Sequence, residues 1–225
     1  MLRNGKLRSL GKTRTEEGKK MSENPKVDRR EILRAGAGAV VGSAALVLAG
    51  RLPDAQAQAQ HIRWDVVHHI GTTVSAGGIA SARAQDGSKI TLTGFGTFVN
   101  SGSGGPNGSA TGGGTWQTFS PGGALTGSGS YSPTRLISFV VAPGMFNPAF
   151  TDAIGNPADF RPGLAVLLIA YSDGSEGTLV ISCNGGFAPA SIFEGITATK
   201  GYVDYWNREA PVGGVDADRT IFHVI

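Results

Sequence analysis

Side chains that could bind a ligand are concentrated in residues 193–209, where aromatic and carboxylate residues occur together. Tyr202, Asp204 and Trp206 occupy alternate positions, so a strand would place all three on one face. Aromatic walls with one acid are typical of a small-molecule pocket. We therefore predict a ligand site formed by these three residues, together with the carboxylate of Glu194.

The carboxylates of the same segment also permit a catalytic interpretation. Asp204 could be paired with Glu194 or with Glu209, and two carboxylates can act as general acid and general base. A third interpretation is structural, with aromatic residues in the core and a solvated acidic edge. The sequence leaves open whether the protein is an enzyme.

The histidines and the cysteine do not have the spacing of a metal or nucleophile motif. We predict no metal and no cofactor, and we interpret the four histidines as surface or strand-end residues: His61, His68, His69 and His223. A single cysteine cannot form an internal disulfide. Cys183 is therefore predicted to be a small buried apolar residue.

The positive charge of the chain is confined to its first part. Residues 1–59 contain 12 basic and 6 acidic residues, a net charge of +6, whereas residues 60–225 contain 8 and 11, a net charge of −3. Nucleic-acid binding needs a basic stripe or patch, which residues 60–225 do not provide. We therefore exclude nucleic acid as a partner.

The first part also contains a pattern typical of export. Arg29 and Arg30 precede two apolar residues, Ile32 and Leu33, and an uncharged run rich in Ala, Gly, Val and Leu follows at 35–50. This run is shorter and less apolar than the roughly 20 residues of a membrane-spanning helix. The order of these features resembles a twin-arginine signal, and we predict no stable membrane span.

Two overlapping small-x-small patterns for signal peptidase come next, with small residues at Ala55, Ala57 and Ala59. We predict cleavage after Ala57 or Ala59, so that residues 1–59 are an unstructured signal segment and residues 60–225 a single mature domain. The partners implied are the twin-arginine translocase and signal peptidase. The predicted location is periplasmic or extracellular.

Residues 60–225 alternate short apolar runs with turn-forming residues, which is typical of strands. Asp86-Gly87-Ser88 predicts a hairpin between 78–85 and 89–99, and 172–175 predicts another between 164–171 and 177–183. Further strands are predicted at 64–70, 115–119, 125–131, 136–142 and 220–225. Helical turns are predicted at 149–154 and 190–193, and the Gly- and Ser-rich residues 101–114 predict a flexible exposed loop.

These elements predict an all-β fold. The successive hairpins favour a single antiparallel barrel of about eight strands, in which residues 220–225 close against the first strand. Glycines at 94, 96, 127 and 129 could bend the strands toward closure. The alternative is a two-sheet β-sandwich.

Three segments together carry a resemblance: 87–94, 112–116 and 193–219. They resemble a group of small exported bacterial β proteins without an assigned function, so the likeness implies an exported domain and no catalytic residues. More loosely, the serial hairpins are similar to allene-oxide-cyclase-like and other small ligand-binding barrels. That second likeness is one of architecture, and a fold does not fix a function.

We expect an exported, non-catalytic protein that holds a small apolar or aromatic ligand in a β-barrel. The first alternative is a cyclase or isomerase that uses cavity shape and an acid, such as Glu194 or Asp204. The second is a structural or surface-interaction protein without a pocket.

Overall fold

The computed structural model describes residues 60–100 and 108–225, all of which belong to the compact unit Arg51–Ile225. The predicted export signal and cleavage sites in residues 1–59 lie outside the described residues, as does the first half of the predicted loop 101–114. Among the described residues, no helix has the length and apolar character needed to cross a membrane.

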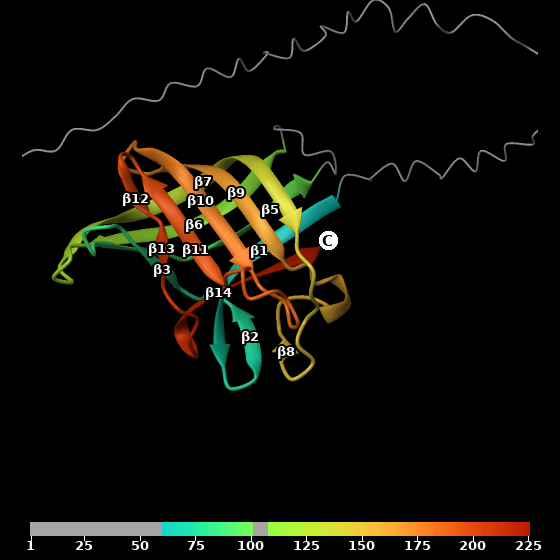
Figure 1. The fold of residues 1–225 in the computed structure, drawn as a ribbon. Helices are drawn as coiled ribbons and strands as arrows, with labels where there is room; N and C mark the ends of the chain where they lie inside the picture. Colours follow the sequence, from blue (N-terminus) through green and yellow to red (C-terminus); the bar gives the residue numbers. More distant parts are fainter. Residues whose placement is uncertain (1–59, 101–107) are drawn as a thin grey trace, which may run out of the picture. The chain divides into compact units, whose positions relative to one another are not determined.

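The prediction of an all-β fold is confirmed (Figure 1). One short 3₁₀ helix, Pro157–Asp159, interrupts the strands in the described residues. The strands are β1 (Gln60–Ile70), β2 (Thr73–Ala76), β3 (Ala80–Arg83), β4 (Lys89–Leu92), β5 (Phe95–Asn100), β6 (Ala110–Phe119), β7 (Leu125–Val141), β8 (Thr151–Asp152), β9 (Gly163–Tyr171), β10 (Glu176–Cys183), β11 (Gly195–Lys200), β12 (Val203–Tyr205), β13 (Asn207–Arg208) and β14 (Gly214–Val224).

The predicted barrel of about eight antiparallel strands is wrong. In the described residues, 14 strands form one mixed sheet that runs β12-β11-β10-β9-β7-β6-β5-β1-β2-β8. Off this path, β14 pairs with β1, and β13, β3 and β4 form a branch that joins at β6. The alternative of two separate sheets is also wrong, because hydrogen-bonded pairs connect all the strands.

The sheet does not close because its ladder is interrupted at Trp206. Tyr205 of β12 pairs with Ala198 of β11, whereas Asn207 of β13 pairs with Arg83 of β3. The branch at β6 depends on glycine. Gly112 has φ +97°, and a Cβ there would lie 2.1 Å from the carbonyl oxygen of Phe95, so only glycine permits this close approach.

Several predicted pairings are confirmed. β14 runs antiparallel to β1, with Trp64 opposite Phe222, so the last strand pairs with the first. Both predicted hairpins form, β3 with β4 and β9 with β10. The turn at Gly87 has φ +85°, and the Asp86 carboxylate accepts the Ser88 N–H at 2.9 Å.

Other elements differ from the prediction. The predicted strand 89–99 divides into β4 and β5 at Gly94, and the two predicted strands between 125 and 142 form the single long β7. The predicted helical turn at 149–154 contains β8, and 190–193 contains a turn and a bend. Ala110–Phe119 is a strand, so the described end of the predicted loop is part of the sheet.

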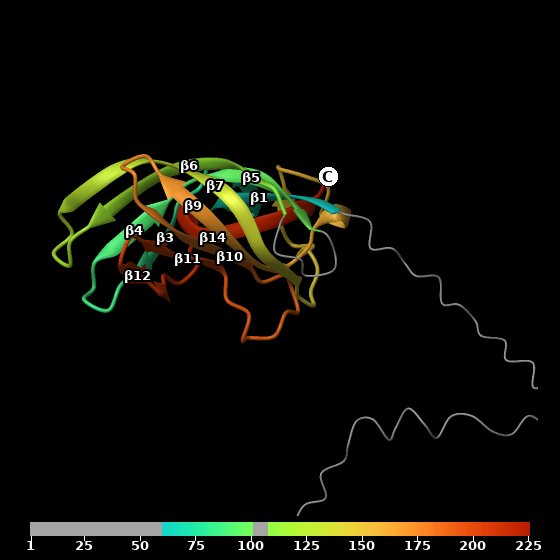
Figure 2. The same ribbon diagram turned by 90° about the horizontal axis from the view of Figure 1, so that it is seen from above.

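The sheet is strongly curved (Figure 2), and the buried side chains of its strands form one hydrophobic core cluster. Trp64, Phe98 and Phe222 are almost completely buried, and the rings of Phe98 and Phe222 each lie about 5 Å from Phe139. Aromatic pairs at this separation contribute beyond their buried area. The centre of the domain is therefore occupied by its own core.

Candidate functional site

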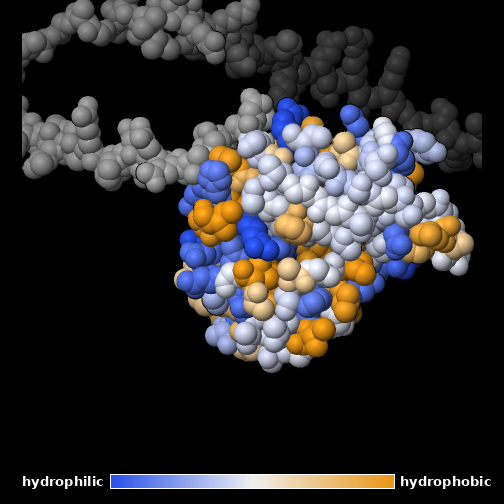
Figure 3. All heavy atoms as spheres, turned by 180° about the vertical axis from the view of Figure 1, so that it is seen from behind, coloured by the Kyte–Doolittle hydropathy of each residue, from blue (hydrophilic) through white to orange (hydrophobic). Residues whose placement is uncertain are grey.

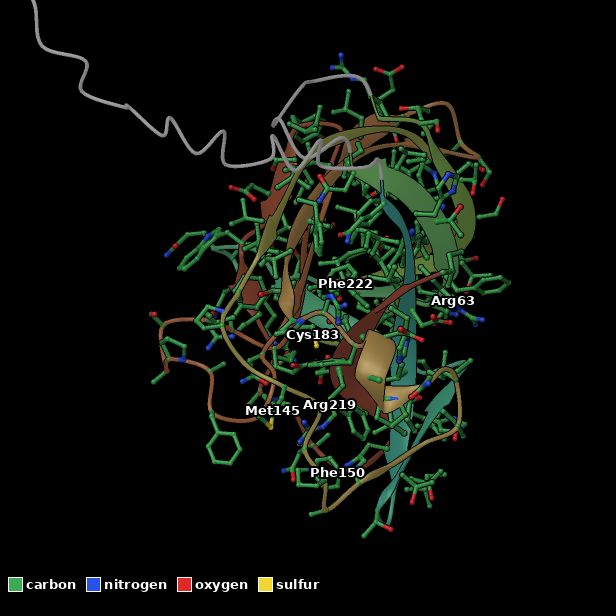
Figure 4. The ribbon with its side chains drawn as sticks, turned by 90° about the vertical axis from the view of Figure 1, so that its right-hand side faces the viewer. Arg63, Met145, Phe150, Cys183, Arg219 and Phe222 are labelled. Carbon is green, nitrogen blue, oxygen red and sulfur yellow. The ribbon has the colours of Figure 1, made fainter. Side chains whose placement is uncertain are left out.

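A small pocket lies at one end of the domain, between β1, β2, β14 and the connections that follow β7 and β10. The volume of this cavity is about 70 Å³. That is room for a few water molecules or for one part of an organic ligand, since an apolar cavity that encloses benzene measures about 150 Å³. Met145, Phe150, Cys183 and Arg219 of this pocket gather in the lower half of Figure 4, away from Arg63.

The pocket walls are mostly apolar and aromatic. His69 and Phe150 meet edge to face with their ring centroids 4.6 Å apart, and Phe146 contacts Phe160 at 5.6 Å. The aliphatic part of the wall consists of Val67, Val74 and Ile221. Such a surface favours the apolar part of a ligand, since apolar area removed from water stabilises a complex.

Backbone hydrogen bonds hold the β7–β8 connection as one wall of the pocket. The Met145 N–H donates to the Gly186 carbonyl at 3.1 Å, and the Gly186 N–H donates back at 2.7 Å. Farther along, the Thr151 N–H donates to the carbonyl of Thr72 at 2.8 Å. The wall is thus fixed to two other parts of the chain.

A buried pair of side chains anchors the same wall to β14. The Asp152 carboxylate lies 2.6 Å from Nε2 of His223, and both side chains are buried. The other Asp152 oxygen accepts the N–H groups of Ile154 and Gly155. His223 lies one residue before the end of β14, as a strand-end residue, but it is buried and acts as an internal anchor, so its interpretation as a surface residue is wrong.

Glu194 is the buried acid of the pocket. Its side chain is 5% exposed, and its two oxygens accept the backbone N–H groups of Thr220 at 2.7 Å and Asn184 at 2.8 Å. Burial raises the pKa of Glu194 to about 7, although these N–H groups and the charge of Arg219 act in the opposite direction. Near neutral pH this carboxyl exists in both protonation states.

Arg219 and His69 reach the pocket from neighbouring strands. Arg219 lies opposite Val67 in the β1–β14 ladder, and His69 lies two residues beyond Val67 after a bulge. Both residues line the same cavity, and Arg219 lies near enough for its charge to act on His69. Burial, and secondarily the charge of Arg219, lower the pKa of His69, so its ring is neutral at neutral pH.

Cys183 is buried in the pocket wall, as the sequence predicts. Burial, and secondarily the charge of Glu194, raise the pKa of the Cys183 thiol well above its ordinary value. A thiol in this state is a poor nucleophile because the thiolate is the reactive form. Within 60–100 and 108–225, no three side chains of the metal-binding types gather to form a cation site.

The structure does not bring the predicted site residues together. Tyr202, Asp204 and Trp206 are exposed on the outer side of the sheet, and only Glu194 lines the pocket. The exposed fraction is 101% for Tyr202, which lies in the turn before β12. The alternation predicted for this segment is present, but Tyr205 is the residue that points inward.

Arg219, His69 and the aromatic residues of the β7–β8 connection are the functional candidates that the sequence does not single out. His69, the β7–β8 connection and Arg219 are separated from one another by more than 60 residues along the chain. Only the pairing of β14 with β1 and the folding of the connection bring them together. No local spacing carries that signal.

Elsewhere on the surface, the large exposed apolar side chains are dispersed. The face in Figure 3 shows orange hydrophobic spots separated by hydrophilic residues. Leu125 and Val140 lie at opposite ends of β7, and Phe187 lies in the connection after β10. Scattered apolar residues of this kind are ordinary on protein surfaces.

Comparison of the chain with family models, with curated proteins and with solved structures finds no match. The functional inference therefore depends on the geometry of the pocket.

Proposed function

We propose that this protein binds a small, mostly apolar molecule in the pocket beside Glu194. The observation that supports the proposal most directly is a buried carboxyl group in a wall that is mostly apolar and aromatic. Pockets of this composition hold the ligand by apolar contact and orient it by a few polar groups. The ligand lies at the end of the domain in this proposal, because the centre is filled.

Calorimetric titration with three probes of one shape tests this proposal. Benzoate, benzamide and benzylamine have the same ring and differ in charge. We expect at least one of them to bind with a stoichiometry of one. If none binds up to millimolar concentration, the proposed function is rejected.

A matched pair of variants locates the bound probe. Met145 and Val140 are both exposed apolar residues, but only Met145 lines the pocket. We expect Met145→Trp to obstruct the pocket and weaken binding, and Val140→Trp to leave binding unchanged. An equal effect of both substitutions would contradict the assigned site.

A second candidate function is catalysis of a cyclisation or isomerisation. The pKa of Glu194, raised to about 7 by burial, lies where a general acid or base is most effective. Asp204 is exposed and does not line the pocket, so Glu194 is the better candidate for this role. If a ligand that can be isomerised is turned over, Glu194→Gln should abolish turnover while that ligand still binds.

We also propose export through the twin-arginine route, with cleavage before residue 60 and a periplasmic or extracellular location. The support is the sequence of residues 29–33 and the three alanines before residue 60. Replacing Arg29 and Arg30 by Lys should leave uncleaved precursor in the cytoplasm. Normal secretion of this variant would exclude the route.

A further inference from the structure

Two nitrogen-containing side chains of the pocket have hydrogen-bonding capacity that the protein does not use. Arg219 donates from Nε to the carbonyl of Val212 at 3.3 Å, and neither of its Nη atoms has a hydrogen bond or ion pair with the described residues. Nε2 of His69 is buried and has no hydrogen-bond partner there. A buried polar atom without a partner destabilises the protein, so a ligand that supplies a partner to Nε2 of His69 is favoured.

Both groups lie on one side of the pocket. The β1–β14 register makes Arg219 the cross-strand neighbour of Val67, and β1–β2 pairing places His69 opposite Val74. All four side chains line the same cavity. The polar groups are thus held on paired strands, next to apolar wall residues.

Deepening the proposed binding function, on which this inference rests, we propose that the ligand is a small monocarboxylate. Its carboxylate accepts hydrogen bonds from the Arg219 guanidinium and from Nε2–H of neutral His69. Its hydrocarbon part lies against the aromatic wall formed by Phe146 and Phe150. Guanidinium groups bind carboxylates in a two-pronged geometry that combines charge and hydrogen bonding.

Glu194 does not prevent such a ligand from binding. Both of its oxygens accept backbone N–H groups, and burial raises its pKa to about 7, so the carboxyl is mostly neutral at pH 6. The other titratable or charged groups that face it are Arg219 from β14, His69 from β1 and Cys183 from β10. Above pH 7 the Glu194 charge opposes the anion, so affinity should fall as the pH rises.

A cationic ligand fits these groups poorly. Arg219 carries a permanent positive charge, and no anion of the described residues pairs with it. A neutral amide would satisfy the hydrogen bonds but would not neutralise the guanidinium. We therefore expect the pocket to distinguish ligands of the same shape by their charge.

The test compares the three probes against the full chain at pH 6 by calorimetry. We expect benzoate to bind at least about tenfold more tightly than benzamide, and benzylamine to bind most weakly. We also expect the affinity for benzoate to fall between pH 6 and pH 8. If benzamide binds as tightly as benzoate at pH 6, the carboxylate inference is overturned, while the proposed binding function stands.

Variants assign the discrimination to one side chain. Arg219→Gln should abolish the preference for benzoate over benzamide, whereas Arg208→Gln, an exposed arginine outside the pocket, should preserve it. Arg219→Lys keeps the charge without the two-pronged geometry and should give an intermediate preference, which also covers the case in which the Gln variant does not fold. An unchanged preference in the folded Arg219 variants would overturn the inference. If no probe binds to the wild-type chain, the proposed function itself fails.

Discussion

Replacing Glu194 by Gln should change the way in which stability depends on pH. Burial raises the pKa of Glu194 in the folded chain to about 7, whereas its ordinary value is 4.5. Between these values the folded state holds a proton that the unfolded state has released. The proton therefore stabilises the folded state fully below pH 4.5, and this contribution is lost as the pH rises through 7.

The size of this effect follows from the two pKa values. A tenfold difference in proton affinity is equivalent to about 1.4 kcal/mol. As the pH rises from 4.5 to 8, the titration of Glu194 therefore lowers the free energy of unfolding by about 3 kcal/mol. Gln does not titrate, so the free energy of unfolding of the variant lacks this dependence on pH. Its carboxamide can accept only one of the two N–H groups of Thr220 and Asn184, which costs about 1–3 kcal/mol at every pH.

Urea denaturation at a series of pH values provides the assay, with the fluorescence of the buried Trp64 and Trp116 as the signal. The difference in unfolding free energy between wild type and Glu194→Gln should shrink by about 3 kcal/mol from pH 4.5 to pH 8. Glu176 is exposed, so Glu176→Gln serves as the control and should leave the slope unchanged. Parallel pH profiles for wild type and Glu194→Gln would refute the assignment of a buried, raised-pKa carboxyl.

Three further substitutions test the packing of the domain, each by urea denaturation. Gly112→Ala should destabilise the chain by more than about 2 kcal/mol, because the added Cβ would meet a backbone oxygen. Gly122→Ala is the control and should be nearly neutral. Equal effects of the two substitutions would contradict the branch at β6. Asp152→Ala should lower the free energy of unfolding by about 2–3 kcal/mol, since two backbone N–H groups and the His223 ring lose their partner. An unchanged free energy of unfolding would show that the Asp152–His223 pair does not anchor the wall. Phe222→Ala should cost about 3–5 kcal/mol, and a change below 1 kcal/mol would contradict a filled core.

The parts of the fold that the sequence predicts correctly are those with local signals. The hairpin at Gly87 forms because Asp-Gly accepts positive φ and the Asp86 side chain bonds to the turn. At Gly94 the sequence predicts a bend, but it does not predict that 89–99 divides into two strands there. This division depends on Gly113 and Tyr131, which approach Gly94 from strands that are distant along the chain.

The closed barrel is predicted wrongly for a similar reason. Alternation and turns establish how many residues lie in strands, but they do not establish which strands pair. Pro133 lies inside the long β7, at a shift in the register between β7 and β9, although proline would ordinarily end a strand. The branch of the sheet at β6 likewise depends on contacts between distant segments.

The candidate site divides in the same way. The segment that contains Glu194 is visible in the sequence because acids and aromatic residues are concentrated there. The exposure of Tyr202 and Trp206 is not visible, since alternation gives two faces without stating which is inside. The roles of Arg219 and His69 become apparent only from the β1–β14 register.

The most direct measurement is a titration of the methyl-labelled full chain with benzoate and benzamide, followed by NMR. If the pocket binds these molecules, saturable shifts will occur at the methyl groups of Val67, Val74 and Ile221, which line it, with the larger affinity for benzoate. The exposed methyl groups of Leu125 and Val140 should not move. Absence of saturable shifts at the three pocket residues, or shifts confined to the exposed ones, would contradict a ligand-binding pocket beside Glu194.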